Sequence, residues 1–141
     1  MRDFGRCAED ATDPKIVCQE RGRRFVLLND RRARVTKVRI DGCVPIEGPL
    51  CGYLLLPTSR PVELYVELRG SAVMHGVEQI EATIQQVSED VRCMRKQRFI
   101  VSTEVPKMKP KRQRVMKRFR TSYDARLVVR THVIEFDLAD A

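Results

Sequence analysis

Glu67 and Arg69 are the pair of residues whose types and spacing most directly suggest chemistry in this chain. They lie in the stretch YVELRG, within the run VELYVELRG, where Leu64, Val66 and Leu68 alternate with other side chains. Successive side chains of a strand point to opposite faces, so one face is apolar and the other carries the acid and the base. Two residues along a strand span about 6.5 to 7 Å, which lets Glu67 and Arg69 pair directly or through water.

The motifs of several common enzyme classes are missing from the sequence. It contains no Gly-rich phosphate loop, no CxxC or HExxH metal motif and no serine in a nucleophile elbow. Aromatic residues make up 6% of the chain and tryptophan is absent, which argues against a platform that stacks single-stranded bases. Recognition of a duplex or of the phosphate backbone fits this composition better.

The strand that carries Glu67 is predicted to be the fourth of an antiparallel meander. The runs RFVLLND and RVTKVRID predict a hairpin over residues 25–40, and the glycines and prolines of DGCVPIEGPLCG predict a long loop. YLLLP then predicts a third strand that ends at Pro57, and the fourth runs from Val62 to Leu68.

A helix is predicted after Gly70, because the hydrophobic period changes there from two to 3.6 residues. Its apolar stripe comprises Val73, Val77, Ile80, Ile84, Val87 and Val91. Ser71 is a candidate N-cap, and His75 and Gln79 lie on the opposite side, toward solvent or a ligand. The strand RFIVST follows, which predicts a crossover connection within the sheet.

The net charge of +8 is unevenly distributed along the sequence. From Arg92 to Arg130 fourteen Lys and Arg face two acids, so this segment is +12, while the rest, with thirteen cations and seventeen acids, is −4. Pro110 suits the first turn of a helix here. Its exposed cations are Lys111, Arg114, Lys117 and Arg118, and Arg112 falls within its apolar stripe. We expect this surface to contact phosphates, although a basic helix that only aids solubility is the alternative.

Length and composition are typical of one soluble domain. The chain has 141 residues, 43% of them hydrophobic, and no apolar run near the roughly 20 residues that cross a bilayer. Residues 1–24 predict a poorly ordered arm or a short helix, and residues 25–141 a single α/β domain that ends in a hairpin of ARLVVRT and HVIEFDL. The five scattered cysteines favour reduced thiols, and with the polar N-terminal sequence they favour the cytoplasm and no membrane partner.

Several of these stretches together resemble the PD-(D/E)XK nuclease superfamily. IDGC, CGYLLL, YVELRGSAVMHGVEQIEATI and FIVSTEVP are similar to a small stand-alone bacterial group that reads CDYLL, then VELKGS, then a helix with a Q-x-E pattern. The resemblance covers roughly Phe25 to Leu138. It implies an α/β fold with a central mixed β-sheet flanked by helices and a restriction-endonuclease-like core.

The resemblance also implies a catalytic site from which this sequence departs. In such nucleases an aspartate and a glutamate hold a divalent metal, usually Mg²⁺, and a lysine positions or deprotonates water. The aspartate falls on Gly52, the lysine falls on Arg69, and Glu67 remains. Arginine stays protonated and cannot act as a general base. The acid and base therefore resemble a remnant of a metal site. No cofactor is expected for such a remnant, whereas an active site would use Mg²⁺.

Three functions follow from this resemblance. The first is an inactive protein that binds nucleic acid, DNA in preference to RNA, through Lys111, Arg112, Arg114, Lys117 and Arg118, with His75 and Gln79 near the old cleft. The second is an active nuclease in which Asp41 or Glu47 replaces the missing aspartate, so that Glu67 and Asp41 are weak metal-ligand candidates. The third is a regulatory module that binds another protein. Because many nucleases of this class are dimers, a homodimer is also an open expectation.

Overall fold

The computed structural model describes residues 4–91, 95–104 and 126–141. This part of the chain is mostly strands and holds one α-helix, α1 (Val73–Val87). The strands are β1 (Ala8–Ala11), β2 (Lys15–Glu20), β3 (Arg23–Leu28), β4 (Val35–Arg39), β5 (Tyr53–Pro57), β6 (Val62–Arg69), β7 (Arg95–Ser102), β8 (Arg126–Thr131) and β9 (Val133–Asp137). Two 3₁₀ helices, η1 (Gly5–Cys7) and η2 (Leu138–Asp140), lie near the ends.

Six strands form a central mixed sheet in the order β1-β4-β5-β6-β7-β8. β4, β5 and β6 pair antiparallel, which confirms the predicted meander from the third to the fourth strand. β7 lies parallel to β6 and is reached through α1, which confirms the predicted crossover. β8 is parallel to β7. The carboxyl ends of β6, β7 and β8 therefore lie at one edge of the sheet.

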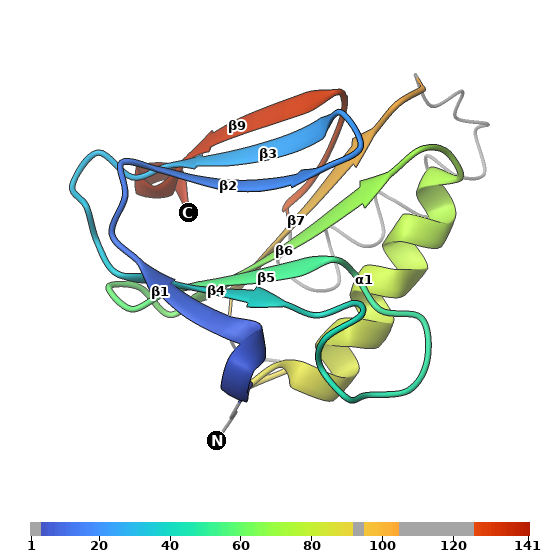
Figure 1. The fold of residues 1–141 in the computed structure, drawn as a ribbon, viewed down its shortest axis with the longest axis horizontal. Helices are drawn as coiled ribbons and strands as arrows, with labels where there is room; N and C mark the ends of the chain where they lie inside the picture. The colour runs from blue at the N-terminus through green and yellow to red at the C-terminus, as the bar shows by residue number, and fades with distance from the viewer. Residues whose placement is uncertain (1–3, 92–94, 105–125) are drawn as a thin grey trace.

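The second sheet is small and covers one face of the first. β2 and β3 pair antiparallel, and β9 lies parallel to β3, in the order β2-β3-β9. Figure 1 shows this sheet over one face of the central sheet and α1 against the other. The prediction of a central mixed sheet is thus confirmed, and of the predicted flanking helices α1 covers one face, while the helix predicted after Pro110 lies outside the described residues.

Two apolar clusters follow from this layering. One lies between the sheets and includes Phe25, Phe99 and Phe136; the ring of Phe99 packs at a tilt against those of Phe25 and Phe136, at centroid distances of 4.7 and 4.9 Å. The other lies under α1 and contains the predicted stripe residues from Val73 to Val87, all buried. The alternation along β6 therefore separates two cores, with Val66 facing the small sheet and Tyr65 facing the helix.

A buried ionic network fixes the end of α1. Glu63 and Lys96 are both fully buried, with Oε1 of Glu63 3.8 Å from Nζ of Lys96. Tyr65 and Ser88 donate their hydroxyls to Glu63, at 3.0 and 2.6 Å, and the backbone N–H of Glu89 donates to its other oxygen at 3.1 Å. Because ionised groups are buried only when they are paired and hydrogen-bonded, this network anchors the residues that follow α1 on β6 and β7.

Three local predictions are wrong. The N-cap of α1 is Ala72, in a left-handed conformation and without a side-chain cap bond, rather than Ser71. The expected hairpin over residues 25–40 does not form, because β3 and β4 belong to different sheets. The same holds for β8 and β9, between which His132 has a φ of 65° and the chain passes from one sheet to the other.

The N-terminal region also differs from its prediction. Instead of a loose arm over residues 1–24, β1 pairs with β4 and β2 pairs with β3, so residues 8–20 belong to the domain. Cys7 and Cys43 form a disulfide, which corrects the prediction that the cysteines are reduced. Cys18 and Cys51 are free and buried. No helix in residues 4–91, 95–104 and 126–141 is long and apolar enough to cross a membrane.

Candidate functional site

The structure places Gly52 directly beside Glu67. Tyr53 is paired with Val66 across β5 and β6, so the residue before Tyr53 lies opposite the residue after Val66. The backbone N–H of Gly52 donates to Oε1 of Glu67 at 3.2 Å. A Cβ atom at position 52 would lie 3.6 Å from the same oxygen, which is an ordinary contact distance. A side chain at this position would therefore lie next to the glutamate carboxylate.

Arg69 completes the group of three motif positions. Its Nη1 lies 3.5 Å from Oε2 of Glu67, and their side chains are 24% and 9% exposed. This confirms that the acid and the base pair directly. Both side chains project from β6 toward α1, because they alternate with the residues that face the small sheet.

The guanidinium of Arg69 is held by further contacts. Its Nε donates to the carbonyl of Ser71 at 3.0 Å, and its Nη1 donates to the side-chain oxygen of Gln79. Gln79 in turn donates to the carbonyl of Leu50 at 3.3 Å. Gln79, expected to face solvent or a ligand, thus links the ion pair to the loop between β4 and β5. His75 is exposed, as its position on the helical wheel predicts.

Gly76 allows α1 to approach the ion pair. A Cβ atom there would lie 2.9 Å from Cδ of Arg69, 3.2 Å from a methyl group of Ile100 and 3.5 Å from Cγ of Glu67. Contacts under 3.0 Å require something to move, so only glycine fits without displacing the arginine. The hydrophobic stripe of the helix gave no sign of this role, although a glycine early in a helix is a costly choice that suggests a close approach.

The pKa of Glu67 is raised to about 7. Burial of the carboxyl group is the main cause, and the nearby charge of Asp41 adds a smaller increase. Arg69 and the backbone N–H groups of Gly52 and Leu68 act in the opposite direction, but they do not offset the burial. The carboxyl group therefore exchanges its proton near neutral pH, which is unusual for a glutamate and common at functional sites.

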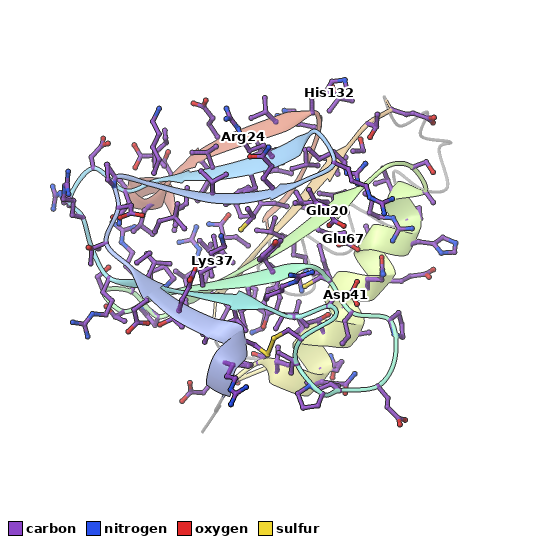
Figure 2. The ribbon with its side chains drawn as sticks, viewed as in Figure 1. Glu20, Arg24, Lys37, Asp41, Glu67 and His132 are labelled. Carbon is purple, nitrogen blue, oxygen red and sulfur yellow. A yellow bond between two sulfur atoms is a disulfide. The ribbon has the colours of Figure 1, made fainter. Side chains whose placement is uncertain are left out.

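The metal-ligand candidates do not assemble into a cation site. Asp41 is exposed in the turn after β4, with its backbone N–H bound to the carbonyl of Cys51 at 3.2 Å. Figure 2 shows Asp41 and Glu67 at the same end of the molecule, with Lys37 further along β4. Glu47, the other acid considered, is exposed in the same loop. In the described ranges no group of three or more His, Cys, Asp or Glu could hold a metal ion.

Arg23 and Arg24 of the small sheet lie near the end of the central sheet at which β6 and β7 finish. Nη1 of Arg23 donates to the hydroxyl of Thr103 at 3.1 Å, and the backbone N–H of Thr103 donates to the carbonyl of Gly70 at 3.2 Å. Arg24 bonds through its backbone to His132, which is bonded in turn to Ser102. Sequence reasoning missed Arg23 and Arg24, because it assigned both to the arm. The basic residues Lys111, Arg112, Arg114, Lys117 and Arg118 lie outside the described residues.

No protein-family model matches the chain, and no curated protein or solved structure is significantly similar to it.

Proposed function

We propose that the protein is a degenerate member of the PD-(D/E)XK class that has lost hydrolysis and binds nucleic acid, DNA in preference to RNA. The observation that supports this most strongly is the convergence of the three motif positions. Gly52, Glu67 and Arg69 come from two strands and meet within hydrogen-bond or ion-pair distance. Such convergence is what a former metal site requires, and a local sequence likeness does not guarantee it.

Loss of hydrolysis follows from the chemistry at these positions. Mg²⁺ prefers several oxygen ligands, and of the three motif positions only Glu67 supplies a carboxylate. The Arg69 guanidinium, 3.5 Å from that carboxylate, places a positive charge beside it. The residues present therefore do not fit a magnesium ion, and no hydrolytic step is derived through one.

Binding to nucleic acid is supported by the distribution of charge. The segment from Arg92 to Arg130 has a net charge of +12. In the described part of the chain, Arg23 and Arg24 add cationic groups near the end of the sheet where β6 and β7 finish. Cations near phosphates displace condensed counterions, and this term dominates affinity for a duplex. The protein acts in the cytoplasm under this proposal, with DNA as its partner.

A second candidate is an active nuclease with a migrated ligand. Its supporting observation is that the charge of Asp41 influences the pKa of Glu67, so the two carboxylates are electrostatically coupled. A metal bound between them would draw Asp41 inward from its exposed position. Nicking of a plasmid by the natural protein with Mg²⁺ or Mn²⁺ would favour this candidate over the first.

The binding proposal is tested by fluorescence anisotropy with a labelled duplex and the RNA of the same sequence, at several salt concentrations. Replacing Lys111, Arg114, Lys117 and Arg118 with glutamine should weaken binding without sequence preference. The slope of log affinity against log salt should become shallower by about 0.9 for each phosphate that the variant no longer neutralises.

The matched control replaces four exposed cations elsewhere with glutamine, at Lys15, Arg31, Arg32 and Arg34. It should retain most of the affinity, although its net charge is the same. Equally weakened binding in both variants would mean that affinity depends on the overall charge of the protein and not on the four residues replaced in the first variant. Unchanged binding in the first variant would mean that these basic residues do not contact the nucleic acid, and a protein partner would then be the better hypothesis.

A further inference from the structure

The Cys7–Cys43 disulfide joins two segments at the surface. Cys7 lies in η1 and Cys43 in the loop between β4 and β5, with Cα atoms 5.7 Å apart. Cys43 is exposed and Cys7 is half-buried. A thiolate in solution can therefore reach this bond, and exposed disulfides are more often labile or regulatory than buried ones.

The disulfide forms part of the wall of a positively charged cavity of about 350 Å³. Three cations, Arg6, Lys37 and Arg39, line this cavity against one acid, Glu9. They come from η1 and from β4, so the fold gathers charges that are far apart in the sequence. The cavity is separate from the Glu67 site, because Lys37 and Tyr53 face the small sheet whereas Glu67 faces α1.

The three cations differ in how firmly they are held. Nζ of Lys37 donates to the carbonyl of Val17 at 2.6 Å and lies 5.5 Å from the ring centroid of Tyr53. The guanidinium groups of Arg6 and Arg39 make no hydrogen bond or ion pair with the residues that the structure describes. Their guanidinium groups therefore remain open to an anion that enters the cavity.

We propose that the Cys7–Cys43 disulfide is an exchange site for small thiols that carry a carboxylate or another anionic group. Arg6 and Arg39 attract the anionic group, and the thiolate attacks Sγ of Cys43, the more exposed residue of the pair. A new S–S bond forms as the Cys43–Cys7 bond breaks, and Cys7 leaves as a thiolate that takes a proton from water. A second small thiol then attacks the mixed disulfide, releasing Cys43 and an oxidised small-molecule disulfide, so two thiols supply the two electrons.

The surrounding cations favour this reaction at two stages. They raise the local concentration of an anionic thiol, and they stabilise the thiolate that leaves. The other described thiols do not compete, because burial raises the pKa of Cys18 and of Cys51 to about 12.

Exchange would release a covalent tie on the loop that borders the Glu67 site. This loop includes Leu50, whose carbonyl accepts from Gln79, and leads to Gly52, whose N–H donates to Glu67. With the disulfide reduced, only noncovalent contacts would hold this part of the loop near Glu67, among them these hydrogen bonds and those that Cys51 makes with Asp41 and Thr83.

The test compares three thiols of nearly equal size: 2-mercaptoethanesulfonate, which is anionic, 2-mercaptoethanol, which is neutral, and 2-aminoethanethiol, which is cationic. Reduction of the full-length oxidised protein, in a Cys93→Ser background, is followed by alkylation and mass spectrometry. Each rate is divided by the rate of the same thiol with an uncharged small disulfide. We expect the anionic thiol to react about tenfold faster than the neutral one at low salt, and the cationic thiol to be slowest.

Two variants decide whether the cavity causes this order. Replacing Arg6 and Arg39 with glutamine should reduce the preference for the anionic thiol to within about twofold of unity. Replacing Arg31 and Arg34, which precede β4 and are exposed, should leave the preference unchanged at the same net charge. Equal rates for all three thiols, a preference that survives in the first variant, or mass spectra that show Cys7 and Cys43 as free thiols under oxidising conditions would each overturn the proposal.

Discussion

Replacing Glu67 with glutamine should make the protein more stable at alkaline pH. The pKa of Glu67 is about 7 in the folded protein against a reference value of 4.5, chiefly because the group is buried. Between these values the folded state binds more protons than the unfolded state, so the free energy of unfolding falls as pH rises. Glutamine has no charge at any pH, and it retains an oxygen that can accept from Gly52.

The expected magnitude follows from the two pKa values. Each pKa unit corresponds to about 1.4 kcal/mol, so ionising the buried Glu67 costs about 3 kcal/mol once the pH is well above 7. The cost falls away below about pH 4.5, where the carboxyl group is protonated in both states. The stability difference between Glu67→Gln and the natural protein should therefore increase by about 3 kcal/mol, in favour of the variant, between pH 4.5 and pH 8.

Urea denaturation across this pH range measures the difference directly. The control is Glu78→Gln, which removes the same charge from an exposed position on α1 and should show a nearly flat difference. A flat profile for Glu67→Gln, or a variant that becomes relatively less stable as pH rises, would refute the reasoning. A flat profile would mean that the contacts of the ionised glutamate, chiefly with Arg69, offset its burial, and a profile of the opposite sign would mean that they outweigh it.

Two further substitutions test the elements that position the site. Glu63→Ala should lower the free energy of unfolding by about 3 to 5 kcal/mol, because it removes a buried carboxylate that accepts three hydrogen bonds and lies 3.8 Å from Nζ of Lys96, whereas exposed Glu78→Ala should change it little. A decrease below about 1 kcal/mol in urea denaturation would show that the buried network adds little. Gly76→Ala should destabilise the protein by about 1 to 3 kcal/mol despite the better helix propensity of alanine, because its Cβ would lie 2.9 Å from Cδ of Arg69. Calorimetry that showed a stabilised variant would contradict the close approach of α1.

The elements that the sequence predicted correctly are those whose patterns depend on one neighbouring surface. The alternation along β6 and the 3.6-residue stripe of α1 each report one buried face, so β5, β6, α1 and β7 could be located. The pairing of β3, β4, β8 and β9 could not be predicted, because a turn signal shows that the chain reverses but not which of two sheets the next strand joins. The disulfide was not predicted either, because Cys7 and Cys43 are 36 residues apart in the sequence and only the tertiary fold brings them together.

The site was predictable where a motif marks it and not where tertiary packing makes it. The resemblance singled out Gly52, Glu67 and Arg69, and the structure brings these three together. The contact from Gln79 to Arg69 and the clearance provided by Gly76 depend on the angle at which α1 packs on β6. No pattern within the helix specifies that angle.

The proposed function depends above all on Gly52, Glu67 and Arg69 occupying a former metal site. Calorimetric titration of Mg²⁺ and Mn²⁺ into the natural protein and into a Gly52→Asp, Arg69→Lys double variant tests this, with Glu67→Gln added to the variant as a control. We expect no binding by the natural protein, binding by the double variant, and no binding once Glu67 is replaced in that variant. Metal binding and plasmid nicking by the natural protein, or no binding by either protein, would contradict the proposal.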